Sequence, residues 1–193
     1  MKKMKHLVAV LLAGIMALAV LTGCGQTNVD LSDKLAQKAT EVYAKAFGVK
    51  AEKVQLTEGA AALNKAMLDA IGEDGVMVLN KGDKNIEDVS ISADKRGMMI
   101  LHKNESCENN RYRMVITAVF LSGERTEQDA RILAPVAALK AEQVNAILSG
   151  SLDGLKIDSF GKPTDEEIKG VGVSAKKLKD GTYCYVLTID MIS

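Results

Sequence analysis

The chain is poor in aromatic residues, histidine, cysteine and proline. Its 193 residues include no Trp, two His, three Cys and two Pro, and 4% of them are aromatic. Basic and acidic residues are equal in number at 25 each. Nucleic-acid binding relies on a basic face and on aromatic side chains for stacking, so no nucleic-acid partner is expected. The length and the apolar fraction of 47% fit one folded domain.

The first 24 residues carry the pattern of an export signal. The start is basic and has no acidic residue, with Lys2, Lys3 and Lys5. The apolar run over residues 7–21 is shorter than the about 20 residues that span a bilayer, and it is typical of the core of a secretory signal. It leads into an aliphatic residue, two small residues and a cysteine, Leu21-Thr22-Gly23-Cys24. This sequence resembles the lipobox of bacterial lipoproteins.

The resemblance implies that residues 1–23 are removed and that Cys24 becomes a lipidated N-terminus. Two or more acyl chains give stable residence in a membrane. Residues 24–30 form a polar linker that reaches roughly 20 Å when extended, so the folded part is expected close to the membrane. The alternatives are an ordinary signal peptide with a chance cysteine, or an uncleaved anchor. The expected partners are the membrane, through the lipid, and another envelope protein.

Cys107 and Cys184 are the two cysteines that remain once Cys24 carries lipid. An even pair outside the cytoplasm favours a disulfide. Such a bridge would tie the polar loop 103–110 to the last strand, and closing that segment contributes about 4 kcal/mol in the chain-entropy account. Two separate inert thiols, or a redox or metal role, are the alternatives. The chain has no Cys-x-x-Cys pair, which weakens the redox interpretation.

His102 is the histidine that a catalytic triad would have to use, because His6 lies in the leader. It alternates with Met98 and Ile100, so we expect a partly buried residue of a strand. Neither a Gly-x-Ser-x-Gly motif nor a paired set of zinc ligands accompanies it, and we expect no metal and no cofactor. The function favoured is therefore a non-enzymatic binding or envelope-support module. The alternative is an envelope enzyme, with thiol chemistry at Cys107 or Cys184 or hydrolysis centred on His102.

Apolar periodicity predicts a single α+β domain over residues 31–193. Helices are expected over residues 31–47, 58–71, 126–133 and 139–148, with Thr57 as an N-cap and Gly72 as a stop. A short further helix is expected to begin near Thr164. Strands are expected over residues 76–79, 89–93, 97–103, 111–121, 170–177 and 182–192, the last two joined by the turn Lys179-Asp180-Gly181. We expect an antiparallel sheet with two to four helices packed mainly on one face.

The strand over residues 111–121 offers a candidate binding surface. Arg111 and Arg113 fall on one face of this strand, and Glu105 lies in the loop before it. If the domain binds a partner, we expect these three residues to contribute. Solvated charge on an outer sheet face is the simpler interpretation for each residue taken alone.

Two segments resemble the cysteine-rich secretory, antigen 5 and pathogenesis-related domains. Val171-Gly172-Val173 and Asp180-Gly181-Thr182-Tyr183-Cys184-Tyr185-Val186 are similar to the closing hairpin of that family, and Leu63-Asn64-Lys65-Ala66 is similar to an early helix. The similarity covers under a fifth of the chain. The paired His and Glu cleft residues of the family have no counterpart here, so no site residue is transferred.

Overall fold

The computed structural model describes residues 30–47, 55–91, 95, 97–107, 111–138 and 168–192. The leader, Cys24 and the predicted helices at 139–148 and after Thr164 lie outside these ranges. The backbone of Glu105, Cys107 and Arg111 is described, but their side chains are not. In the described ranges, none of the helices combines the length and the apolar character needed to cross a membrane.

Two helices in the described part begin where the sequence predicts. Helix α2 spans Ser32–Phe47 and helix α3 spans Glu58–Asp69. Thr57 is extended (φ −65°, ψ 158°), and its Oγ1 accepts from the N–H of Ala60, so the predicted N-cap is confirmed. Beyond the end of α3, the Nζ of Lys176 donates to the carbonyl of Ile71, where a cation also complements the helix dipole.

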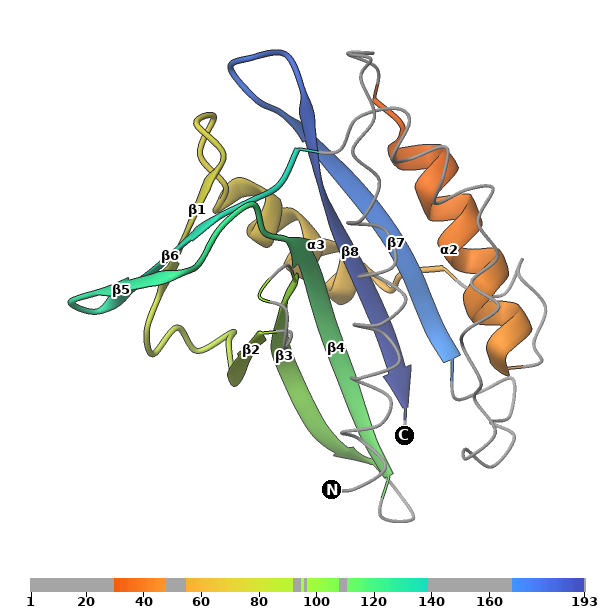
Figure 1. Cartoon of the computed structure of the whole chain (residues 1–193). Helices are drawn as coiled ribbons and strands as arrows, with labels where there is room; N and C mark the ends of the chain where they lie inside the picture. Colours follow the sequence, from red (N-terminus) through yellow and green to blue (C-terminus); the bar gives the residue numbers. More distant parts are fainter. Residues whose placement is uncertain are drawn as a thin grey trace.

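The strands form two antiparallel sheets (Figure 1). The large sheet has the order β2-β3-β4-β8-β7, with β2 Asp88–Ile91, β3 Gly97–Cys107, β4 Arg111–Phe120, β7 Ile168–Lys177 and β8 Tyr183–Ile192. The small sheet has the order β1-β6-β5, with β1 Val76–Asn80, β5 Thr126–Gln128 and β6 Arg131–Pro135. The predicted β2–β3 and β7–β8 hairpins are confirmed, and Gly181 supplies the positive φ of 84° in the second turn.

The helix predicted over residues 126–133 is wrong, because this segment forms the hairpin of β5 and β6. Asp129 adopts a φ of 53° in the turn and reverses the chain. Beyond the turn, Ile132, Ala134 and Val136 are buried, whereas Leu133 and Pro135 are half-buried. That alternation has a period of two, and β1 supplies the partner strand that fixes it.

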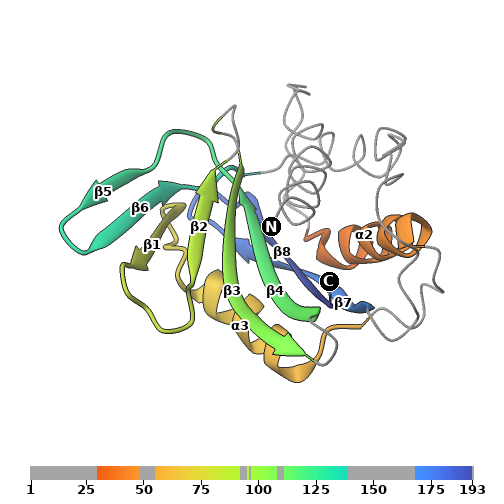
Figure 2. The same cartoon turned by 90° about the horizontal axis from the view of Figure 1, so that it is seen from below.

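The two helices in the described ranges lie on opposite faces of the large sheet, and the other helices expected to pack on it, at 139–148 and after Thr164, lie outside those ranges. In β8, Cys184 and Val186 belong to the core cluster on the α3 side, whereas Tyr185 packs with Leu35 of α2. Successive strand residues point to opposite faces, so α3 and α2 must cover different sides. Figure 2 shows α3 and α2 on either side of the large sheet.

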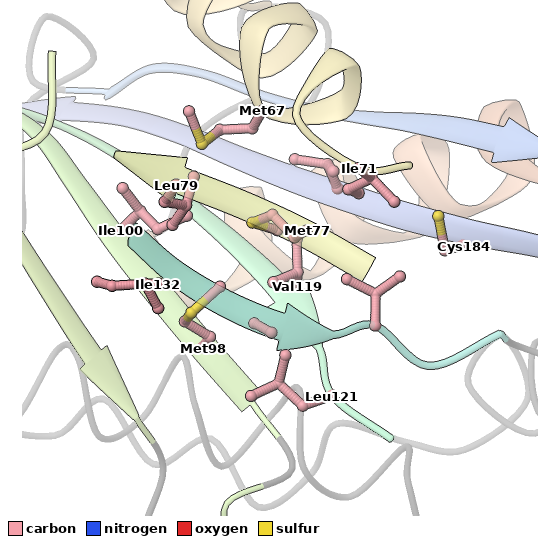
Figure 3. Packing of buried hydrophobic residues seen from close by; sticks show 13 residues of the cluster. Met67, Ile71, Met77, Leu79, Met98, Ile100, Val119, Leu121, Ile132 and Cys184 are labelled. Atoms are coloured by element: carbon pink, nitrogen blue, oxygen red, sulfur yellow. The ribbon is translucent and has the colours of Figure 1, made fainter. Parts of the chain in front are cut away.

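The main core lies between the large sheet, α3 and the small sheet (Figure 3). It contains Met67, Ile71, Met77, Leu79, Met98, Ile100, Val119, Leu121, Ile132, Ala134, Val136, Cys184 and Val186. Methionines from three elements fill this interior, as their unbranched side chains suit irregular spaces. The core therefore joins the two sheets and fixes α3 against β4 and β8.

Gly170 and Gly172 let the chain before α3 approach β7 closely. A Cβ at Gly170 would overlap the backbone of Gln55 and Leu56, and one at Gly172 would meet the side chain of Leu56. The register also shifts between Ile168 and Gly170, which marks a bulge. The glycine pair therefore marks a bent strand that another segment of the chain approaches closely.

Candidate functional site

Polar side chains are concentrated between α3 and the large sheet. In the described ranges, the buried polar or charged residues are Asn64, His102, Thr117, Thr188 and Asp190. They come from α3 and from the three central strands β3, β4 and β8. A buried polar group must find a partner because it has lost water, so the hydrogen bonds of each residue define what it can do.

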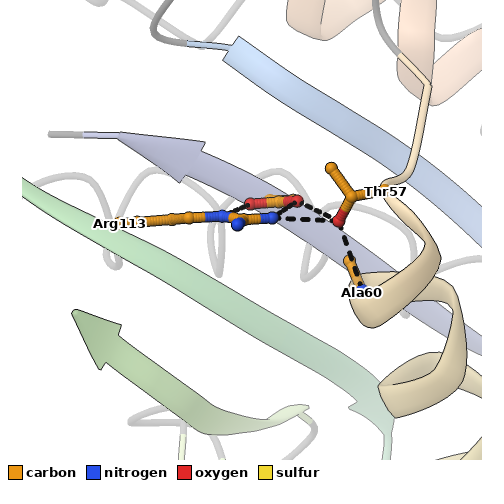
Figure 4. A network of polar contacts seen from close by, with 4 residues as sticks. Thr57, Ala60 and Arg113 are labelled. Carbon is orange, nitrogen blue, oxygen red and sulfur yellow. Dashed lines mark hydrogen bonds and ion pairs between the residues drawn. The ribbon is translucent and has the colours of Figure 1, made fainter.

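The first group is an ion pair that ends in the cap of α3 (Figure 4). Asp190 is completely buried, and its Oδ1 accepts from Arg113 Nε at 3.0 Å, while its Oδ2 accepts from Arg113 Nη2 at 2.7 Å. The hydroxyl of Thr57 donates to the same Oδ2 at 2.7 Å and accepts from Arg113 Nη2 at 3.0 Å. We call Arg113, Asp190 and Thr57 the helix-cap triad. It joins the start of α3 to β4 and β8.

The helix-cap triad leaves its groups little freedom to act as catalysts. Both carboxylate oxygens of Asp190 accept charge-assisted bonds, and the Thr57 hydroxyl donates once and accepts from two N–H groups. A general base would need a lone pair directed at a substrate. The arrangement instead positions α3, with Asp190 as the buried anion that both other groups hold.

Asn64 provides a second attachment of α3 to the sheet. Its Nδ2 donates to the backbone carbonyl of Val186 at 3.1 Å and to Thr188 Oγ1 at 2.8 Å. Thr188 is paired with Thr117 across the β4–β8 ladder, and both are fully buried. Residue 64 is thus held by β8 two turns after the capped end of α3.

His102 lies in a strand, as predicted, but it is buried rather than partly buried, with 3% of its surface exposed. Its Nδ1 lies 3.0 Å from the carbonyl oxygen of Asn85, which can only accept, so Nδ1 carries the proton. Its Nε2 then accepts from the hydroxyl of Thr117 at 2.7 Å. Burial lowers the pKa of His102 below 6.5, and the bond to Asn85 and the charge of Asp83 only partly oppose this. The ring is therefore neutral near pH 7.

The predicted disulfide between Cys107 and Cys184 is not formed. Cys184 is a free, buried thiol that donates to the carbonyl of Lys176. Cys107 pairs with Arg111 at one end of β4, whereas Val186, two residues from Cys184, pairs with Val119. The eight residue-to-residue steps of β4 from Arg111 to Val119 span roughly 27 Å, but a disulfide needs Cα atoms about 4.4–6.8 Å apart. Spacing in the sequence could not show that the two cysteines lie toward opposite ends of the sheet.

The predicted binding residues occupy neighbouring positions on β3 and β4. Glu105 is paired with Arg113, and Cys107 with Arg111. Arg113 does not present a simple solvated charge, because its side chain holds Asp190. The binding role of Glu105 and Arg111 stays a prediction. Asp190 and the second role of Thr57 were not predicted, although an acidic residue within the apolar strand β8 is the signal that could have indicated a buried partner.

Among the described residues, no group of three or more His, Cys, Asp or Glu side chains is placed to hold a metal ion. Cys184 is poorly suited to nucleophilic chemistry, since burial raises the pKa of its thiol. Comparison with known proteins adds no family assignment. No family model, curated protein or solved structure matches this chain.

Proposed function

We propose that this protein is a bacterial lipoprotein, held outside the cytoplasm by lipid on Cys24, whose α+β domain binds or supports an envelope partner without catalysis. The observation that carries the proposal is the order of a basic start, a fifteen-residue apolar run and the sequence Leu21-Thr22-Gly23-Cys24. Helix α2 begins at Ser32, so a short linker would keep the domain near the membrane.

The hydrogen bonding of the buried polar residues supports a non-enzymatic role. Asp190 is held by two partners, and both ring nitrogens of His102 are engaged with protein groups. Cys184 is buried, and its raised pKa keeps it in the weakly nucleophilic thiol form. His102 and Cys184 are two of the three residues on which the alternative of an envelope hydrolase or redox accessory depends, and the side chain of the third, Cys107, lies outside the described part. The binding function is therefore preferred.

The lipid anchor is tested by replacing Cys24→Ser in the full-length protein. We expect the unaltered protein to sediment with membranes and its mass to equal residues 24–193 plus acyl chains. The C24S protein should keep residues 1–23 and carry no fatty acid. Cys107→Ser and Cys184→Ser are the matched controls and should be processed normally. A mature product that starts at Met1 without an acyl group would overturn the proposal.

The absence of catalysis is tested separately, in cells whose deletion of this protein has a measurable envelope defect. Variants His102→Gln and Cys184→Ala remove the titratable ring and the thiol that an enzyme would need. In medium at pH 7, where the ring of His102 is neutral, we expect both to restore the envelope as well as the unaltered protein does, when present in equal amounts. Loss of rescue by a stably produced variant would favour the enzymatic alternative.

A further inference from the structure

The segment of residues 81–87 joins the two sheets, leading from β1 to β2. Its own turns are closed by Asn85 N–H to Asp83 Oδ1 at 2.8 Å and by Ile86 N–H to the Asp83 carbonyl at 2.9 Å. The Glu87 N–H donates to the carbonyl of Leu101 at 2.8 Å. We call residues 81–87 the junction loop. It is more exposed than the strands it joins, with Lys84, Asn85 and Glu87 at the surface.

A bulge in β3 directs His102 toward this loop. The β3–β4 register passes from Leu101 paired with Ile116 to Lys103 paired with Val115, so His102 is the extra residue. Its ring lies between the loop and β4, donating to the Asn85 carbonyl and accepting from Thr117. One buried side chain therefore connects the junction loop to the centre of the large sheet.

This connection depends on the charge of the ring. In the neutral form each nitrogen has a matched partner, one acceptor and one donor. Protonation makes Nε2 a donor, so the Thr117 hydroxyl must reverse, and it also places a cation in a buried site. Two groups of the loop partly offset this cost, because the hydrogen bond to the Asn85 carbonyl and the charge of Asp83 both favour the protonated ring, so burial is what opposes it. The partner from β4, Thr117, carries no charge.

The junction loop is the element that can open locally when the ring is protonated. His102 and Thr117 belong to strands with neighbours on both sides, whereas the loop is largely exposed and is held by a few hydrogen bonds, the Lys81–Glu127 ion pair and the half-buried side chain of Ile86. Local opening occurs where few buried contacts must be broken. Opening the loop would let water reach the ring without separating β3 from β4.

We propose that His102 is a pH-sensitive latch, which holds the junction loop against the large sheet while the ring is neutral and releases it in acid. Its use in the cell rests on the proposed function, because a protein outside the cytoplasm meets the ambient pH. The latch itself is a property of the fold. Experiments on purified protein therefore separate its failure from a failure of the proposed location.

The titration of His102 is measured by NMR on the full-length protein in detergent. The chain has two histidines, and the signal that disappears in His102→Gln identifies the buried one. We expect a pKa below 6.5, and a further decrease in Asp83→Asn, which keeps the Oδ1 acceptor but removes the favourable charge. A pKa of 6.5 or above, or no decrease in D83N, would overturn the latch.

Opening of the junction loop is measured by hydrogen exchange of peptides covering residues 81–87. Between the pKa of the closed state and the ordinary value, protection should fall by up to about tenfold per pH unit after correction for intrinsic rates. The H102Q protein should lack this fall. Asn85→Ala is the matched control, since it keeps the accepting carbonyl and should behave like the unaltered protein. Constant loop protection, or an equal fall in H102Q, would contradict the proposal.

Discussion

At the scale of single residues, the surroundings of a charge decide what its ion pair contributes. Lys65 and Asp69 form a pair whose side chains are 74% and 63% exposed, so water can replace either partner. Pairs of that kind contribute about 0–1 kcal/mol. Asp190 has no such access to water, and its carboxylate is held by Arg113 and Thr57 of the helix-cap triad. Removing one partner leaves a buried charge with too few hydrogen bonds.

Two arginines provide a matched test of this difference. Arg113 and Arg125 are similarly exposed, at 31% and 29%, but their partners Asp190 and Glu127 are 0% and 44% exposed. We expect Arg113→Met to lower the free energy of unfolding by about 3 kcal/mol. Arg125→Met should lower it by less than about 1 kcal/mol. Urea unfolding of both variants measures the difference, and equal losses would show that the burial of Asp190 does not matter.

At the scale of helices and strands, the sequence predicts elements with one strong local signal and fails where two periods compete. Thr57 and the Asp180-Gly181 turn mark the start of α3 and the β7–β8 hairpin, and both were correctly predicted. In residues 126–133, where a helix was predicted, Ala130, Ile132 and Leu133 are the only apolar residues, too few to distinguish a helical period from that of a strand. Pairing with β1 decides between them, and that partner lies more than 50 residues earlier.

The same holds for the candidate site residues: those marked by their sequence neighbours could be predicted, and those defined by distant partners could not. His102 was placed correctly because its neighbours Met98 and Ile100 reveal the strand. The partners of Asp190 could not be predicted, since Thr57 and Arg113 are 133 and 77 residues away. The proposed disulfide failed for the same reason, because only the register of β3, β4 and β8 shows how far apart Cys107 and Cys184 lie.

The contact between β7 and the segment before α3 gives a test at this scale. Gly170→Ala would force a methyl group into the backbone of Gln55 and Leu56, whereas Gly172→Ala would meet the flexible end of the Leu56 side chain. We expect G170A to lower the free energy of unfolding by at least about 3 kcal/mol and G172A to lower it by about 1 kcal/mol. Gly59→Ala, in open space on α3, should stabilise by about 0.5–1 kcal/mol. Thermal unfolding of the three variants gives the order of their stabilities. A G170A protein as stable as the unaltered one would contradict the close approach of residues 55 and 56 to β7.

At the scale of the whole molecule, acid should weaken the fold in two separate ranges of pH. His102 has a lowered pKa in the folded state, so the unfolded chain binds more protons just below pH 6.5. Glu127 and Asp180 also have lowered pKa values, the first mainly through its hydrogen bond from Lys81 and the second through that from Thr182. As carboxyl groups, they lose their contribution only when the pH falls through about 4 and below.

The range between pH 7 and 5 therefore reports on His102 alone, and it gives a prediction for the stability of the whole protein. The neutral, buried ring contributes stability that is fully present above pH 6.5 and is lost as the pH falls toward the lowered pKa. We expect the free energy of unfolding to decrease between pH 7 and 5 in the unaltered protein. His102→Gln should remove that decrease and keep the one near pH 4, which belongs to the carboxylates. Urea unfolding at closely spaced pH values measures both ranges, and an H102Q protein with an unchanged upper range would show that another group titrates there.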